Sequence, residues 1–276
     1  MDKKDPKIKI STILFYLIAT TYACLTIGPF VWSIIVSLKP TSELGNINVN
    51  FSKLNFHSYN YIWNKFPFLR WTINSIIVTL IITSGNLLLN SMAGYAMARI
   101  EFPGKNALFL FCLGMMMIPG QVLLVPQFML ISKLGWVNTY QGLTVPFLTG
   151  VFGIFLMRQF FLSIPKSLEE AALIDGMGRF GIFFKIILPL AKPALSTQFI
   201  LTVVGTWGSF LMPSILTSTE AMFTLPVGLN SFKSQYFSFD NQVMAGAMIL
   251  TLPAVIIFII FQNNFIKGIA TTGLKD

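Results

Sequence analysis

The stretch "SIPKSLEEAALIDGMGRFGIFFKIILPLAKPA", residues 163–194, lies between two strongly apolar segments and is the densest cluster of charge in the second half of the chain. Ser167 and Glu170 have the spacing of a capping box, which predicts that a helix begins with Ser167 as its N-cap. Acidic side chains in a first turn also suit the positive end of a helix dipole. Gly176 stands where a left-handed residue would end that helix. The stretch therefore predicts a short helix, sharply turned at its end, between two apolar segments.

The composition indicates an integral membrane protein. The chain has 276 residues, of which 54% are hydrophobic and 11% are charged, whereas soluble domains carry about 25% charged residues. The net charge of +9 does not indicate nucleic acid binding, because the charges flank the apolar runs as they do in membrane proteins. Cys24 and Cys112 lie in apolar runs and are expected to be small core residues, and His57 is expected on a solvated loop. No metal site is indicated.

Six apolar runs predict six transmembrane helices, since about 20 apolar residues cross a bilayer. Their approximate ranges are 11–38, 71–97, 107–131, 143–161, 186–216 and 243–265. The predicted organisation is a tail over 1–10, a first helix over 11–38, a core domain over 71–267 with the charged loop near 163–189, and a tail over 268–276. Most of the 19 Lys and Arg residues fall on the side of the termini. The positive-inside rule therefore places both termini and the charged loop in the cytoplasm.

The runs lack the groups that some transport mechanisms need. No acidic or basic residue lies near the middle of a run, which weakens a proton-coupled carrier. A phosphate-binding GxxxxGK loop is also absent, so energy for uphill transport would enter through a partner. Polar side chains do occur within the runs, and they serve either as interhelical hydrogen bonds or as the lining of a path for a polar, uncharged solute. The candidates for such a path are Gln121, Gln127, Thr206, Trp207 and Ser209.

The spacing within the charged loop resembles a known family. Glu170-Ala171-Ala172 is followed by Gly176 and then by Ile186-x-Leu188-Pro189, which is similar to the "EAA" loop of permease subunits in binding-protein-dependent ABC importers. The resemblance covers nearly the whole chain and is greatest to the shorter maltose-transporter-like permeases of the carbohydrate uptake family. It extends to "YAMARIEFPGK" (95–105), "IPKSLEEAALIDG" (164–176), "TLPVGLNSF" (224–232) and "GLKD" (273–276). The chain departs from that pattern at Ser167, where relatives often carry an acidic residue, and at Gly208, where they often carry Asn.

The resemblance implies an all-α membrane protein with the type I ABC importer permease fold, six spans and cytoplasmic termini in a prokaryotic cell membrane. It implies a subunit that is not an enzyme and has no cofactor, with ATP hydrolysis on a separate subunit. The implied partners are a second, non-identical permease, two copies of a cytoplasmic ATPase and an extracellular or periplasmic sugar-binding protein. The residues implied in ATPase coupling are Glu169, Glu170, Ala171, Ala172, Asp175, Gly176, Leu188 and Pro189.

Two further regions receive roles by the same resemblance. The loop near 217–241 would face outside and contact the binding protein through Leu229, Asn230, Gln235 and Tyr236. The tail would touch the ATPases through Gly273, Leu274 and Lys275. The leading hypothesis is a permease subunit for a sugar, of the oligosaccharide class. The alternatives are an ABC permease for a non-sugar solute and a secondary carrier, against which the missing charges within the runs argue.

Overall fold

The computed structural model describes residues 10–235 and 240–273, and every regular element in these ranges is a helix. The chain divides into two compact units. The smaller unit comprises Met1–Phe66 and Phe232–Ile249, and the larger unit comprises Pro67–Ser231 and Leu250–Asp276. Four of the described helices are long and apolar enough to cross a membrane, or up to six if each bent pair of helices is one span. The prediction of six spans agrees with this range.

The smaller unit is built on α1 (Ile10–Leu38), whose 29 residues include Pro29. The segment Ser11–Leu38 is a candidate span with none of its most apolar window buried inside the chain. A helix that is apolar on all sides suits a hydrocarbon environment. The prediction that Cys24 is a core residue is wrong, because its side chain is exposed on α1. The sequence pattern identified the apolar helix but carried no information on what covers it.

A polar segment follows α1. It contains the 3₁₀ turns η1 (Thr41–Glu43) and η2 (Phe51–Lys53) and the helix α2 (His57–Lys65). His57 is exposed, as expected, but it begins α2 and is not on a loop. The buried Lys39 organises the segment: its Nζ donates to the carbonyl of Asn46 at 2.7 Å, and its own carbonyl accepts from Asn241 Nδ2 at 2.9 Å. Asn241 lies at the start of α15 (Asp240–Gly273), which contains a candidate span over Asp240–Ile260.

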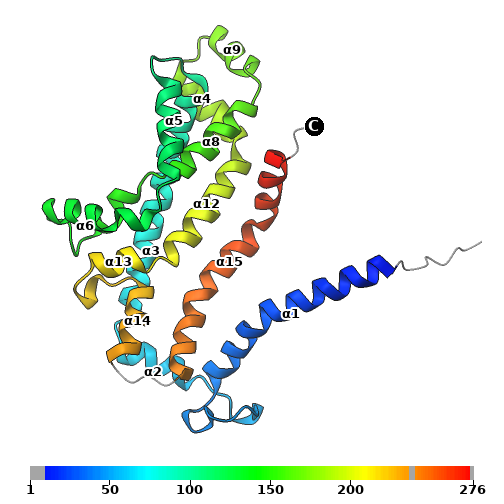
Figure 1. Cartoon of the computed structure of the whole chain (residues 1–276), viewed down its shortest axis with the longest axis vertical. Coiled ribbons are helices and arrows are strands. Elements are labelled where there is room, and N and C mark those ends of the chain that lie inside the picture. Colours follow the sequence, from blue (N-terminus) through cyan, green and yellow to red (C-terminus); the bar gives the residue numbers. More distant parts are fainter. Residues whose placement is uncertain (1–9, 236–239, 274–276) are drawn as a thin grey trace, which may run out of the picture. The chain divides into compact units, whose positions relative to one another are not determined.

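The first long element of the larger unit is α3 (Phe68–Gly85), which continues through a π-helical turn, η3 (Asn86–Asn90), into α4 (Ser91–Arg99). The segment from Phe68 to Arg99 is a candidate span, as is the later segment Tyr140–Ser163. That later segment contains α7 (Tyr140–Thr144), η5 (Val145–Phe147) and α8 (Val151–Ser163). In Figure 1, α4 and α8 run side by side, and the short α9 (Ser167–Ile174) follows α8 at one end of the pair.

The third and fifth spans, predicted as single helices, are bent pairs. The third consists of α5 (Lys105–Met116) followed by η4 (Gly120–Leu123) and α6 (Leu124–Lys133), with a bend of 95°. The fifth consists of the segment Arg179–Leu190 followed by α12 (Lys192–Trp207), with a bend of 78°. Proline is present at each bend (Pro119 in the first, Pro189 and Pro193 in the second), and it cannot donate to the helical ladder and clashes with the preceding turn. The expected core position of Cys112 is also wrong, because this residue of α5 is only half-buried.

The segment before the second bend contains α10 (Arg179–Ile182), the π-helical turn η6 (Phe183–Ile187) and α11 (Leu188–Leu190). Beyond α12 the chain forms α13 (Leu211–Leu216), η7 (Glu220–Met222) and α14 (Leu225–Gln235). The predicted fifth span, 186–216, therefore joined separate helices: α12 ends at Trp207, and α13 begins four residues later.

Buried amides connect the long helices of the larger unit. Asn86 Nδ2 donates to the carbonyl of Phe147 at 2.7 Å, and Gln198 Nε2 donates to the carbonyl of Asn86 at 2.8 Å. Asn90 donates to Asn86 Oδ1 at 2.9 Å and accepts from the Gly150 amide at 3.0 Å. Of the two roles considered for polar residues within the spans, these side chains serve interhelical hydrogen bonding.

Gly94 allows α4 to approach α8 closely, and this contact can be tested. A Cβ at this position would lie 2.9 Å from the backbone nitrogen of Arg158 and 2.9 Å from Met157 Cβ. We expect Gly94→Ala to destabilise the fold by about 1–3 kcal/mol, because a packed interface must shift to admit the methyl group. Thermal unfolding in detergent measures the effect. Gly114→Ala is the matched control, since a Cβ there meets nothing within 4 Å, and an equal change in both variants would contradict the packing argument.

Candidate functional site

The helix α9 ends as the sequence predicted. Gly176 has a φ of 81°, in the left-handed region. Its amide donates to the carbonyl of Leu173 at 3.0 Å, and the next amide, of Met177, donates to the carbonyl of Ala172 at 2.9 Å. This pair of hydrogen bonds is the Schellman motif. Glycine therefore turns the chain sharply at this point and leads it toward α10.

The predicted capping box at the start of α9 is wrong. Ser167 is the first residue of the helix, Lys166 is the N-cap, and no side chain caps this end. Lys166 already has helical angles, with φ −63° and ψ −30°, so the helix begins one residue earlier than the capping box requires. The amides of Glu169 and Glu170 donate to the carbonyl of Lys166 instead. Neither glutamate side chain is therefore used to cap the helix.

The two adjacent glutamates of α9 have different environments. Glu169 is 5% exposed, and its Oε1 lies 2.9 Å from Arg99 Nε at the end of α4. The hydroxyl of Tyr95 donates to Glu169 Oε2 at 3.1 Å. Glu170, by contrast, is exposed. Both glutamates are among the predicted coupling residues, but only Glu170 presents its carboxylate on the surface.

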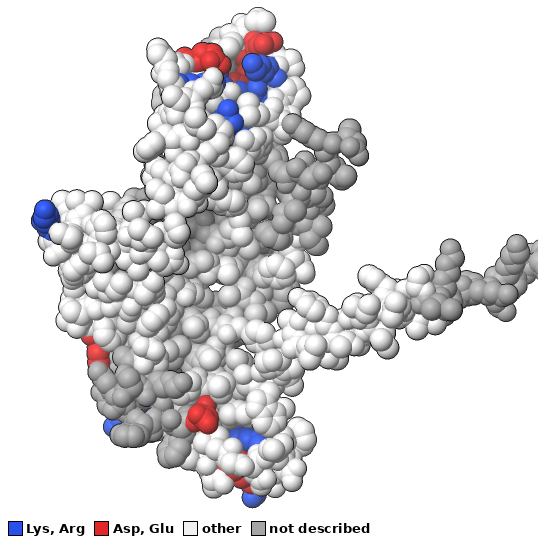
Figure 2. Space-filling model, in the orientation of Figure 1, with Lys and Arg blue, Asp and Glu red and all other residues white. Residues whose placement is uncertain are grey.

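The outer face of α9 combines acidic and apolar side chains. Glu170, Ala171 and Asp175 are exposed, and so is Ile174, at 86%. Charged side chains gather at this end of the larger unit in Figure 2, whereas the flanks of its helices are largely uncharged. Such a surface can contact a protein through an apolar centre with carboxylates at its edge.

The inner face of α9 packs against a buried cluster formed by α4, α8 and the segment after α9. Ala172 is 5% exposed and belongs to this cluster together with Phe161 and Ile182. Of the remaining predicted coupling residues, Leu188 packs against the same cluster and Pro189 is exposed on α11. The structure therefore brings most of the predicted loop residues to one end of the larger unit.

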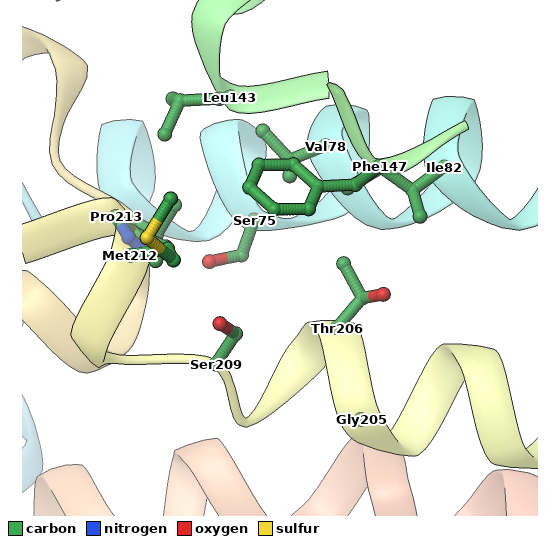
Figure 3. A pocket seen from close by; sticks show the side chains of 11 residues that line it. Ser75, Val78, Ile82, Leu143, Phe147, Gly205, Thr206, Ser209, Met212 and Pro213 are labelled. Atoms are coloured by element: carbon green, nitrogen blue, oxygen red, sulfur yellow. The ribbon is translucent and has the colours of Figure 1, made fainter. Parts of the chain in front are cut away.

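A second candidate site is a cavity of about 150 Å³ between α3, α7, η5 and the α12–α13 region. Figure 3 shows Ser75, Thr206 and Ser209 around this space, with Val78 and Phe147 forming part of its apolar wall. Hydroxyl groups and apolar side chains line it, and no charged side chain is among its described lining residues. A neutral polar molecule is the kind of ligand that such a lining suits.

The predicted path residues divide between this cavity and other places. Thr206 and Ser209 line it, but Trp207, which lies between them in sequence, does not. Trp207 is 7% exposed and its indole Nε1 donates to the carbonyl of Leu250 at 2.7 Å, which is a packing position. Gln121 is exposed on η4 and Gln127 is half-buried on α6, and neither is among the residues lining the cavity.

Sequence reasoning missed a polar anchor beside the cavity. Asn74, fully buried on α3, donates to the carbonyls of Ala221 and Phe223 at 2.9 and 2.8 Å, and it accepts from the Tyr140 hydroxyl at 2.6 Å. Trp71, one turn earlier, donates to the carbonyl of Glu220 at 3.0 Å. These side chains hold the base of the segment that leads into α14. An asparagine in an apolar run was the available signal, but its backbone partners lie 147 and 149 residues away in sequence, and Tyr140 lies 66 residues away.

The residues predicted to contact a binding protein follow this anchored segment. On α14, Leu229 is half-buried and Asn230 is exposed. Gln235 is the last residue of α14, and Tyr236 lies outside the described residues. Three residues of the tail were predicted to contact the ATPases. Of these, Gly273 ends α15, whereas Leu274 and Lys275 lie outside the described residues.

Residues 90–271 match the family described as "Binding-protein-dependent transport system inner membrane component". The chain belongs to this family. It is 34% identical over 280 residues to the arabinooligosaccharides transport system permease protein AraQ of Bacillus subtilis, with all of both chains covered. It is 36% identical over 251 residues to the trehalose transport system permease protein SugB of Mycobacterium tuberculosis, covering 90% of this chain and 92% of SugB.

Another relative is the sn-glycerol-3-phosphate transport system permease protein UgpE of Yersinia pestis, with 34% identity over 223 residues, 78% of this chain and 79% of UgpE. Among solved structures, the chain is similar to one from a bacterial ABC transporter involved in the import of the acidic polysaccharide alginate. The TM-score is 0.82 at 22% identity, covering 96% of this chain and 100% of the other. This family member therefore has the type I importer permease fold that the sequence predicted.

The role of Asn74 as an anchor predicts a local effect on the segment that it holds. We expect Asn74→Ala to leave two carbonyls and the Tyr140 hydroxyl, all in part-buried hydrogen bonds, without this partner, at a cost of about 1–3 kcal/mol. Limited chymotrypsin digestion should then cleave faster after Phe223. Asn64→Ala, at an exposed asparagine of α2, is the control. Unchanged cleavage at Phe223 in the Asn74 variant would show that the anchor does not hold the segment.

Proposed function

We propose that the chain is a transmembrane permease subunit of an ATP-driven ABC importer for a sugar of the oligosaccharide class. The observation that carries this proposal is the family match over 90–271 together with relatives named for arabinooligosaccharide and trehalose transport. The cavity supports a neutral solute, because hydroxyl groups line it and no charge is among its described lining residues. Sugars bind through such groups without requiring a charged partner.

The subunit would form half of the translocation path beside a second, homologous permease. Two copies of a cytoplasmic ATPase would supply the energy, and an extracellular or periplasmic binding protein would deliver the sugar to the loop that leads into α14. The distribution of Lys and Arg supports cytoplasmic termini in a prokaryotic cell membrane, with α9 on the same side. The exposed carboxylate of Glu170 would then pair with a cation on the ATPase, and Ile174 would enter an apolar recess there.

A non-sugar solute is the second candidate, favoured by the relative named for sn-glycerol-3-phosphate. An anionic phosphate ester would call for a cation along its path, and the described cavity lining offers none. Uptake by the reconstituted complex, with its binding protein, separates the candidates. We expect ATP-dependent uptake of a neutral oligosaccharide and no uptake by the chain alone. Transport by the chain without any ATPase would instead identify a secondary carrier.

Glu170 tests the proposed ATPase contact. If its carboxylate is an interface anchor, Glu170→Ala should cost about 2 kcal/mol of docking energy, or roughly 30-fold in affinity. Uptake should fall while residual ATP hydrolysis continues, which is measured as the ratio of sugar moved to ATP hydrolysed. Glu101→Ala removes another exposed carboxylate, just after α4, and should leave the ratio unchanged. A normal ratio in the Glu170 variant would assign the coupling elsewhere.

Thr206 tests the proposed path. Thr206→Phe fills much of a cavity of about 150 Å³, so uptake should fall strongly while the protein still folds and assembles. Val204→Phe is the matched control, since Val204 lies on the same helix, is 41% exposed and does not line the cavity. Sugar uptake by proteoliposomes and thermal unfolding are measured together. Equal uptake by the two variants would mean that this cavity is not part of the path.

A further inference from the structure

The buried ion pair between Arg99 and Glu169 joins elements that are 70 residues apart in sequence. Arg99 is the last residue of α4, and Glu169 lies in the first turn of α9. Their side chains are 3% and 7% exposed, and Arg99 Nε lies 2.9 Å from Glu169 Oε1. In the neighbouring ion pair, between Lys105 and Glu101, the glutamate side chain is 85% exposed. The Arg99–Glu169 pair differs from it, because both of its charged side chains are buried.

Arg99 also binds the end of a third helix. Its Nη2 donates to the carbonyl of Phe161 at 2.6 Å and to the carbonyl of Ile164, at the C-terminal end of α8. Carbonyls at this end of a helix lack partners within the helix and attract cations. One guanidinium thus connects α4, α8 and α9.

Tyr95 gives a second attachment from the same face of α4. It precedes Arg99 by four residues, and its hydroxyl donates to Glu169 Oε2 at 3.1 Å. Its ring contacts Phe183 and Phe161, with centroids 5.1 and 6.0 Å apart. Both oxygens of the Glu169 carboxylate therefore have a partner on α4, Oε1 through the ion pair and Oε2 through a hydrogen bond, and the charged side chains of the pair are buried. In such surroundings, removing one partner of a charge pair is costly and its geometry is strict.

The connections on either side of α9 are short or contain glycine. Only Ile164–Lys166 connects it to α8, and Gly176 and Gly178 lie in its connection to α10. We propose that Arg99, Tyr95 and Glu169 form a strap that makes α9 and the end of α4 move as one body. Force that reaches α9 is thereby passed to the packed helices α4 and α8. Glu169 is a positioning residue, in contrast to the surface role of Glu170, and this inference rests on the proposed function.

Spin labels can measure the strap directly in the complete importer complex in proteoliposomes. Lys166→Cys and Ile100→Cys place labels at two exposed positions, at the start of α9 and just after α4, in a background with Cys24→Ser and Cys112→Ser. We expect one narrow distance distribution, with the same mean with and without ATP. Glu169→Gln should broaden that distribution and lower sugar moved per ATP hydrolysed by about tenfold or more. Tyr95→Phe, which keeps the ring packing, should broaden it less.

Glu101→Gln is the matched control, because it neutralises the exposed carboxylate of the neighbouring ion pair. It should change neither the distance distribution nor the transport ratio. The strap is refuted if the distance in the unmodified protein shifts with ATP, or if Glu169→Gln folds and keeps both the narrow distribution and the transport ratio. Should Glu169→Gln fail to fold, the distribution for Tyr95→Phe decides, and an unchanged width refutes the strap. Absence of ATP-dependent uptake by the unmodified complex would refute the proposed function instead, while the label distance would still report on the strap.

Discussion

The close packing of α4 against α8 is the contact on which the rest of the larger unit depends. Gly94 brings the two backbones together, and a Cβ at Gly153 would lie 2.2 Å from Asn90 Nδ2, so both helices need a residue without a side chain. In hydrocarbon, helices gain little from burying apolar surface, and association relies on close approach and on interhelical hydrogen bonds. Both are present here: the glycines allow the approach, and Asn90 binds the Gly150 amide. Arg99 then closes the same pair at its other end through the carbonyl of Phe161.

Polar side chains in the apolar helices serve two different purposes. Asn86, Asn90 and Gln198 bind one another and backbone groups, which fixes helices in place. Thr206 and Ser209 instead face the cavity of Figure 3. The distinction depends on whether a partner lies within hydrogen-bond distance, because an apolar medium offers a polar group no water in its place.

The sequence predicted the helical class and the turn at Gly176, because both depend on local rules of hydropathy and backbone conformation, and its six spans lie within the range of four to six candidates among the described helices. The prediction of Ser167 as the N-cap of α9 was wrong, since Lys166 adopts helical angles and occupies that position. Proline marked the positions of the sharp bends near Pro119 and Pro193, but the bend angles of 95° and 78° depend on packing. The different environments of Glu169, which is buried, and Glu170, which is exposed, could not be predicted, because they depend on Arg99, 70 residues earlier. Asn74 was beyond sequence reasoning for the same reason.

Asn74 and Trp71 donate hydrogen bonds to main-chain oxygens of the segment 220–223. The side chains of Glu220 and Ala221 are exposed and take no part in these hydrogen bonds. Mutation can therefore alter the surface of this segment without loosening its attachment to α3. A lineage of such proteins could acquire a new outer surface by small steps, each of which leaves the framework beneath it intact.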